Sequence, residues 1–307
     1  MAVSAIQPSG QQYVLTFGEQ RAVVTEVGAG LRAYTAGDRD VVDGFAEDEM
    51  CTVGRGQLVL PWPNRIEGGE YEFAGRLHQL PINEPARHNA LHGLTRWMNW
   101  TLIDQAADHA LLSLVLHPQE GYPFTLRFDV EYRLSAGGLS MRTTATNVGR
   151  DPAPYGAGHH PYLTVGTQID EARLKLPALM RLEANDRLIP TGRVLPNRGT
   201  AYDFLELRPI GSSRMDTAFA NLVPDSDGLI RVHLEASGGN PRSTLWMEPA
   251  YRFLMVFTGD GIPDPARRRR GIAIEPMTCA PNAFRSGDGL TILQPGESWS
   301  GRWGILP

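Results

Sequence analysis

The chain has 307 residues, of which 42% are hydrophobic, and carries a formal net charge of -5 at pH 7. This length allows one large β domain or two ordinary ones, and the acidic balance gives no global attraction to nucleic acid, whose binders usually carry a basic face. The first residues lack an export signal, and no run approaches the ~20 apolar residues that span a bilayer. We therefore expect a cytoplasmic monomer or homodimer with a small-molecule partner and no nucleic-acid or membrane partner.

Short segments in which apolar and polar residues alternate predict β-strands along most of the chain. Between them, turn signals such as Glu67-Gly68-Gly69 and Ser237-Gly238-Gly239-Asn240 supply the positive φ that hairpins need. In chain order, the predicted strands are Tyr13–Phe17, Ala22–Val27, Glu70–Phe73, Leu112–Leu116, Leu126–Leu134, Leu139–Thr146, Leu229–Leu234 and Leu254–Phe257.

Helices have little room in this sequence, because 33 glycines and 23 prolines are spread along it. We expect one or two helical turns around Pro81 to Leu91 and no longer helix. No linker, composition shift or fixed-period repeat divides the chain. Residues 1–307 are therefore predicted to form a single all-β domain, a large antiparallel sandwich.

Titratable and hydrogen-bonding residues gather in five segments, each beside a strand-like run. Taken singly, Arg65 is typical of a surface arginine, His92 of a core histidine and Asp216 of a turn. A fold that brings the strands together would unite them in one site. The segments are PWPNRI (61–66), NALHGL (89–94), GHHPYL (158–163), RMDTAF (214–219) and AIEPMT (273–278).

Two glutamates are candidates for a buried catalytic carboxylate. Glu275 ends the strongly apolar run GIAIE, where a charge costs several kcal/mol unless it is paired or functional. Glu248, in LWMEP, has similar surroundings. The residues alone do not choose between these two Glu-Pro sites.

The adjacent histidines His159 and His160 cannot both face one site. Pro161 favours an extended backbone at His160, and successive side chains of an extended segment point to opposite sides. One of the two rings therefore looks into any given pocket.

A metal site is an alternative that the histidine spacing raises. His88 and His92 are four residues apart, as in a helical zinc pair, but Pro85 and Gly93 disfavour a helix there. A metal-dependent isomerase built on His78, His88 and His92 stays open, although we expect no metal. The run Arg267–Arg270 is expected to be a solvated loop.

The five segments, in this order, resemble the aldose 1-epimerase (galactose mutarotase) family over nearly the whole chain. The resemblance implies an antiparallel β-supersandwich and a cofactor-free reaction that interconverts the α and β anomers of a free sugar. Further matching motifs are Glu120-Gly-Tyr-Pro, Leu188-Ile-Pro-Thr-Gly, Met215-Asp216, Pro281-Asn-Ala-Phe and Leu293-Gln-Pro-Gly-Glu.

The resemblance also implies roles for individual residues. Glu275 is similar to the family's general base and His160 to its general acid, whereas Glu248 has no such counterpart. Such chemistry would suit an ionised Glu275 and a protonated His160 in the resting site. Arg65, His92 and Asp216 would hold the sugar, Trp62, Tyr162 or Trp97 would cover one of its faces, and His159 would be structural.

Some positions depart from the galactose mutarotase pattern. Pro161 and Leu163 follow His160, and Trp62-Pro63 precedes Asn64-Arg65, which resembles branches that include enzymes for sugars with a phosphate or sulfonate at carbon 6. The expected substrate is therefore a hexose or a C6-modified hexose. The alternative is a non-catalytic carbohydrate-binding or sensing protein on the same fold.

Overall fold

Antiparallel strands make up nearly all the regular structure of this protein, whose computed structural model describes residues 6–307. Each predicted strand overlaps an observed one, so the all-β prediction is confirmed. The predicted turn Ser237–Asn240 joins two strands of a hairpin in the largest sheet.

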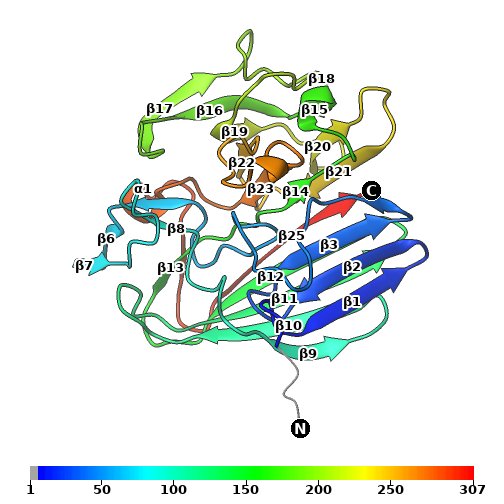
Figure 1. Cartoon of the computed structure of the whole chain (residues 1–307). Coiled ribbons are helices and arrows are strands. Elements are labelled where there is room, and N and C mark those ends of the chain that lie inside the picture. Colours follow the sequence, from blue (N-terminus) through cyan, green and yellow to red (C-terminus); the bar gives the residue numbers. More distant parts are fainter. Residues whose placement is uncertain (1–5) are drawn as a thin grey trace.

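The nine-stranded sheet extends from the bottom to the top of the molecule in Figure 1. Its long central strands alternate buried and exposed residues, which is the pattern that predicted them from the sequence. In spatial order it contains β18 (Arg208–Pro209), β15 (Arg173–Lys175), β20 (Ile230–Glu235), β21 (Arg242–Met247), β25 (Ser298–Leu306), β12 (Gly138–Asn147), β11 (Leu126–Ser135), β10 (His109–Leu116) and β9 (Thr101–Gln105).

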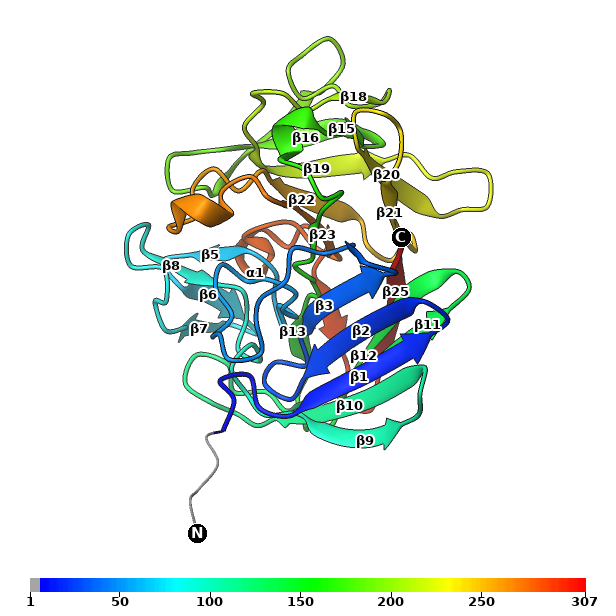
Figure 2. The ribbon, with the colours of Figure 1, turned by 45° about the vertical axis from the view of Figure 1, so that its right-hand side comes forward.

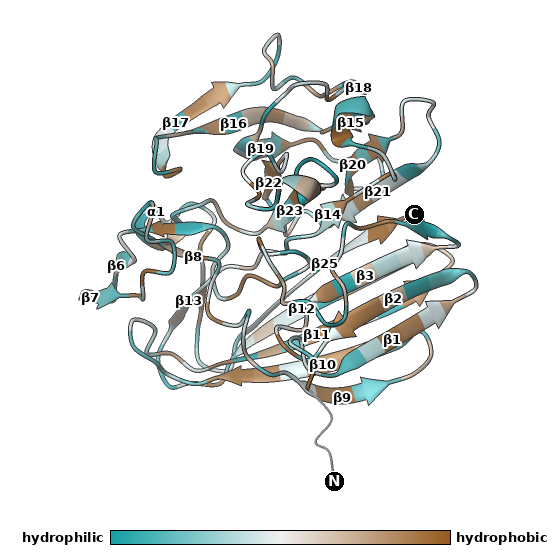
Figure 3. Cartoon of the chain, viewed as in Figure 1, coloured by the Kyte–Doolittle hydropathy of each residue, from teal (hydrophilic) through white to brown (hydrophobic). Residues whose placement is uncertain are grey.

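A four-stranded sheet lies against the lower half of the nine-stranded sheet in both ribbon views (Figures 1 and 2). Apolar residues of the two sheets, such as Leu15, Val24, Phe128 and Val130, belong to one buried core. Brown segments on these strands mark the apolar residues in Figure 3. The strands are β1 (Gln12–Phe17), β2 (Gln20–Thr25), β3 (Leu31–Ala36) and β4 (Arg39–Asp40).

A six-stranded sheet forms the upper part of the molecule together with the end of the nine-stranded sheet. Three two-stranded ribbons complete the strands: β5 (Arg65–Glu67) with β8 (Asn89–Leu91), β6 (Glu70–Phe73) with β7 (Arg76–Gln79), and β13 (Ala153–Tyr155) with β24 (Thr291–Leu293). The order of the six-stranded sheet is β14 (Tyr162–Leu163), β23 (Ile272–Met277), β22 (Phe253–Phe257), β19 (Asp216–Leu222), β16 (Ala178–Ala184) and β17 (Pro190–Pro196).

The helical turns expected around Pro81 to Leu91 are wrong. This segment forms a hydrogen-bonded turn followed by β8, because the backbone N–H of Asn89 returns to the carbonyl of Glu84 and His88 has a φ of 54°. The observed helices are short: α1 (Ala283–Ser286), η1 (Ile169–Glu171) and η2 (Pro265–Arg267), the last two of the 3-10 type. Within residues 6–307, no helix has the length and apolar character needed to cross a membrane.

Arg267 and Arg269 of the run 267–270 bind the body of the protein, whereas Arg268 and Arg270 are exposed. Arg267 lies 2.7 Å from a carboxylate oxygen of Glu49, and Arg269 donates to Asp260 at 2.9 Å and to the carbonyl of Gly211 at 2.7 Å. These two guanidinium groups fasten the loop between β22 and β23, which was predicted to be solvated.

Candidate active site

Three neighbouring strands of the six-stranded sheet direct polar side chains to one face. Glu275 of β23 is paired with Met255 of β22, and Asp216 of β19 is paired with Phe257 of β22. Cross-strand partners point to the same side of a sheet, so the two carboxylates share a face. Tyr162, on β14, adds an aromatic ring at the edge of this surface.

A two-stranded ribbon brings Arg65 and His92 over the same surface. Arg65 begins β5 and pairs with Leu91 of β8, and His92 follows directly. The backbone N–H of His92 donates to the carbonyl of Asn64 at 2.8 Å, while the N–H of Asn64 donates to Nδ1 of His92 at 3.2 Å. This reciprocal pair fixes the imidazole relative to the ribbon.

The sheet and the ribbon enclose a cavity of about 300 Å³. All the predicted site residues except Trp62 line it, although they come from segments that are far apart in the sequence. The lining residues are Val53, Gly54, Asn64, Arg65, Arg87, Leu91, His92, Arg96, Trp97, His160, Tyr162, Asp216, Met255, Phe257, Gly261 and Glu275.

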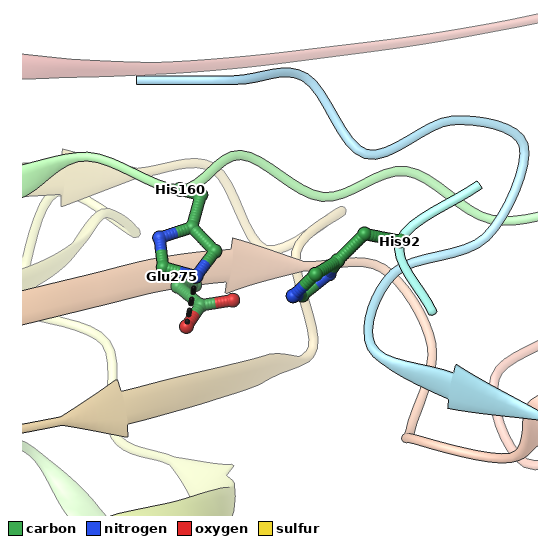
Figure 4. Close-up of side chains that lie close together, drawn as sticks. All are labelled: His92, His160 and Glu275. Atoms are coloured by element: carbon green, nitrogen blue, oxygen red, sulfur yellow. Dashed lines mark ion pairs between the residues drawn. The ribbon is translucent and has the colours of Figure 1, made fainter. Parts of the chain in front are cut away.

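At the bottom of this cavity, His160 and Glu275 form a buried pair. Nε2 of His160 lies 3.3 Å from Oε1 of Glu275, and the two side chains are 6% and 2% exposed (Figure 4). The ring of His92 is 5.2 Å from that of His160, centroid to centroid, and the ring of Tyr162 stacks on His160 at the same distance. An imidazole and a carboxyl group are therefore held within reach of one small ligand.

Burial shifts both members of the pair toward their neutral forms. It raises the pKa of Glu275 well above its usual value, with a further contribution from Asp216, and it lowers the pKa of His160 to about 3. Both shifts favour the neutral pair over the expected resting state with Glu275 ionised and His160 protonated, which stays a prediction. Both distributions contain one proton, so they differ only in which group carries it.

His92 presents a proton to the cavity rather than a lone pair. Its Nδ1 accepts the N–H of Asn64, so in the neutral ring the proton is on Nε2. Burial, followed by the charge of His160, lowers the pKa of His92 well below its usual value, which favours the neutral ring. We therefore assign His92 as a hydrogen-bond donor.

This proton assignment also bears on metal binding. His92, His160 and Glu275 offer ligand atoms that all lie within 4.8 Å of one another. A metal would need the Nε2 lone pair of His92, which the protonated nitrogen lacks, so these residues fit a metal poorly. The set His78, His88 and His92 is not brought together: His78 stacks on Tyr71 at 4.9 Å and His88 is exposed.

Arg65 and Asp216 provide the charged walls of the cavity. Arg65 donates from Nε and Nη2 to both carboxylate oxygens of Glu84, at 2.9 and 3.0 Å, and this fork is fixed in one orientation. Burial raises the pKa of Asp216, while the charge of Arg65 opposes the shift. The two residues offer donors and acceptors for hydroxyl groups.

Trp62 is a correction to the predicted site. It is 2% exposed and packs edge-on against Phe284 at 5.5 Å, inside the main hydrophobic core. The cis bond between Leu60 and Pro61 precedes it, and its side chain points away from the cavity that Asn64 and Arg65 line. Trp62 therefore packs in the hydrophobic core and does not cover a ligand in the cavity.

The structure separates the two alternatives that the residues left open. Glu248 pairs with Arg302 at 2.7 Å, outside the cavity, so of the two glutamates Glu275 is the one at the site. Nε2 of His159 lies 3.2 Å from Thr143 Oγ1 and 3.2 Å from the hydroxyl of Tyr251 in the core, whereas His160 faces the cavity. The alternation of these two histidines is as predicted.

Asn64 and Arg96 are among the lining residues that were not predicted. Asn64 is 2% exposed, and its Oδ1 accepts the N–H of Arg65, which turns the amide toward the cavity; the Asn-Arg-Ile motif was its signal in the sequence. Arg96 donates only to Gln57 and to the carbonyl of Leu91, and among residues 6–307 no carboxylate pairs with it. Burial lowers its pKa.

The fold is an all-β supersandwich, and its polar cavity holds a buried acid–base pair as the active site of an enzyme would. The profile of one family, aldose 1-epimerase, matches residues 11–305. The chain therefore belongs to the aldose 1-epimerase family.

Individual relatives agree with this assignment. The uncharacterised protein YihR of Escherichia coli is 34% identical over 97% of this chain and 93% of its own length. Human galactose mutarotase is 29% identical over 70% of this chain and 67% of its own length. The solved structure of the GalM/aldose epimerase homologue from C. elegans has a TM-score of 0.85 at 18% identity, covering 96% of this chain and 98% of that one, and so shares the fold.

Proposed function

We propose that this protein is an aldose 1-epimerase that interconverts the α and β anomers of a hexose or a C6-modified hexose without a cofactor. The observation that carries the proposal is the buried pair of Glu275 and His160, 3.3 Å apart, which faces a cavity with hydrogen-bonding walls. Mutarotation requires one base and one acid at a single carbon, and the pair supplies both.

In the proposed reaction, Glu275 accepts the proton of the anomeric hydroxyl and His160 protonates the ring oxygen. The bond between carbon 1 and the ring oxygen breaks as the aldehyde forms. Both oxygens belong to the anomeric carbon, so groups a few ångströms apart reach both. Rotation about the bond between carbons 1 and 2 followed by the reverse proton transfers closes the ring on its other face.

The proton distribution of the pair follows the reaction. Ring opening converts a carboxylate and an imidazolium into a carboxylic acid and a neutral imidazole, which is the form that burial favours. Relative to a cyclic complex that holds the ionised pair, burial therefore favours the open-chain complex. The charge of Arg65, which lowers the pKa of Glu275, works in the opposite direction and keeps the carboxylate accessible.

The remaining lining residues would orient the sugar. His92 donates from Nε2, Arg65 donates from its fixed guanidinium, and Asp216 accepts. Arg96 supports the C6-modified alternative, because it lines the cavity without a carboxylate partner among residues 6–307 and an anionic substituent would provide one.

Anomerisation measured by polarimetry or by NMR exchange tests the proposal. Fresh α-glucose, α-galactose and hexoses with phosphate or sulfonate at carbon 6 would be compared with wild type and Glu275→Gln. We expect the variant to lose about 10²- to 10⁴-fold in kcat, since a positioned acid or base contributes about that much. Glu248→Gln is the matched control, because it changes the other Glu-Pro site outside the cavity.

Two outcomes would contradict the proposal. Equal rates for wild type and Glu275→Gln on an accepted sugar would remove Glu275 as the base. Calorimetry that shows tight sugar binding, together with no anomerisation of any sugar bound, would instead favour the carbohydrate-binding or sensing alternative.

A further inference from the structure

A second buried ion pair lies next to Tyr162, whose ring stacks on His160. Arg55 donates from Nε and Nη2 to Oδ2 of Asp43, at 3.2 and 3.1 Å, and the two side chains are 1% and 5% exposed. Removing two charges from water is costly, and an apolar pair of similar volume is often at least as stable. Fold stability alone therefore gives little reason for a charged pair at this place.

The guanidinium of Arg55 connects to the site through an aromatic ring. It lies over the ring of Tyr162, 4.9 Å from the centroid, and that ring is stacked on His160 at 5.2 Å with an interplanar angle of 21°. The hydroxyl of Tyr162 donates to the carbonyl of Val53 at 3.1 Å, which prevents the ring from sliding. Arg55 itself does not line the cavity.

We propose that Arg55, fixed by Asp43, is a positioning residue that orients His160 through Tyr162 and makes its imidazole a better proton donor. This inference rests on the proposed epimerase function. The stack sets the plane of the imidazole, and the nearby permanent positive charge opposes a second positive charge on the ring. The charge thereby favours the neutral imidazole, which is the form of His160 after it has given its proton to the ring oxygen.

Several other groups act on His160, and none of them is altered by a substitution at Arg55. Glu275 of β23 is its carboxyl partner, His92 stands edge-on from the ribbon, and Arg65 and Arg96 add positive charge from the cavity wall. Burial and the charges of Arg96, Arg55 and Arg65 together lower the pKa of His160. Arg55 is thus one of three arginines whose charge lowers the pKa of His160, and unlike Arg65 and Arg96 it does not line the cavity.

The test is a titration of His160 in the sugar-free full-length protein, followed by ¹³C and ¹⁵N NMR of labelled histidine and assigned with His160→Gln. The main variant is Arg55→Met with Asp43→Asn, which leaves no unpaired buried charge. Arg55→Lys keeps the charge but loses the two-pronged contact with Asp43. Arg208→Met is the matched control, because Arg208 also lies over an aromatic ring, 4.0 Å from the centroid of Phe204, but away from the cavity.

We expect the His160 pKa to rise by about one unit in the double variant, as for loss of a charge several ångströms away. On an accepted sugar, kcat should fall about tenfold or more because the imidazole of His160 loses its fixed orientation. KM should stay within about twofold of wild type because Arg55 makes no sugar contact. Arg55→Lys should lower kcat with a smaller pKa change, and Arg208→Met should alter neither quantity.

An unchanged His160 titration together with an unchanged kcat, in a double variant that is folded by circular dichroism, would overturn the proposal. If the double variant does not fold, the same two readings on Arg55→Lys decide: wild-type kcat in that variant would overturn it as well. The titration needs no substrate. Absence of anomerisation by wild type would therefore count against the epimerase function and leave the link between Arg55 and His160 to be judged by NMR.

Discussion

At the scale of single residues, one proton shared by Glu275 and His160 controls the proposed chemistry. Activity requires the pair to hold one proton, and it fails when a second proton binds or when the last one leaves. Because burial lowers the pKa of His160 to about 3 and raises that of Glu275, these two events are pushed apart in pH. We therefore expect the pair to hold one proton over a wide range of pH.

The pH dependence of kcat/KM follows from these shifts. We expect the acid limb to lie below about pH 5 rather than near the usual histidine pKa of about 6.5. Rates of anomerisation measured from pH 4 to pH 9, with circular dichroism at each pH to confirm folding, check this. An inflection near pH 6.5 in folded protein would mean that His160 is solvated in the working enzyme.

Trp62 provides a second prediction at this scale. Because its ring packs in the core against Phe284 and Tyr122, Trp62→Phe should lower the free energy of unfolding by about 1–3 kcal/mol. KM for an accepted sugar should stay unchanged, since the ring does not line the cavity. Urea unfolding and steady-state kinetics give the two numbers. A several-fold rise in KM at unchanged stability would return Trp62 to the sugar site.

At the scale of elements, glycines in loops and strands leave room for neighbouring side chains to pack closely. Gly54 has a φ of 77°, and a Cβ atom there would be 2.9 Å from Cδ2 of His160. Gly301 and Gly304 of β25 likewise make room for the rings of Trp299 and Trp246. Glycines inside a strand weaken its alternating pattern, so β25 was not predicted, although it is central to the largest sheet.

Gly54→Ala should impair catalysis through this contact. The added methyl group pushes the His160 ring away from Glu275, so we expect kcat to fall about tenfold or more, with a loss of about 1–2 kcal/mol in unfolding free energy from the backbone strain. Gly228→Ala is the matched control. Its φ is 83° and its Cβ would meet no atom within 4 Å, so it should lose similar stability and keep the wild-type kcat.

At the scale of the whole molecule, His159 joins the two large sheets behind the site. Its backbone N–H donates to the carbonyl of Pro276 in β23 of the six-stranded sheet. Its side chain lies 3.2 Å from Thr143 of β12 and packs on Trp303 of β25, both in the nine-stranded sheet. The assigned structural role for this histidine is consistent with these contacts.

Acid stability should depend on His159. Burial lowers its folded-state pKa to about 3, whereas an unfolded histidine titrates near 6.5, so its stabilising contribution is complete above about pH 6.5 and is lost as pH falls toward 3. In that window His159→Gln should reduce the slope of unfolding free energy against pH by about 1.4 kcal/mol per unit. Urea unfolding between pH 4 and pH 7.5 measures the slopes, and equal slopes would show that the ring is solvated when folded.

The sequence by itself determined the strand-rich fold and pointed to most of the titratable residues that line the cavity. Alternation of apolar and polar residues predicts strands locally, and the ordered motifs around Arg65, His92, His160, Asp216 and Glu275 identified the segments that meet. These are properties of short stretches of chain, which is why they could be read without the fold. The segment Pro81 to Leu91 shows the limit, since its last residues pair with the distant strand β5 and its Glu84 binds Arg65.

Only the tertiary structure decided what surrounds each side chain. In the folded protein Trp62 lies in the core and Glu248 pairs with Arg302. Arg269 of the arginine run binds its neighbours, and the guanidinium of Arg55 lies over the ring of Tyr162. The tertiary structure also favours the shared proton on Glu275, because desolvation depends on every chain segment packed around the pair. Burial and electrostatic environment are sums over distant residues, so no local pattern in the sequence contains them.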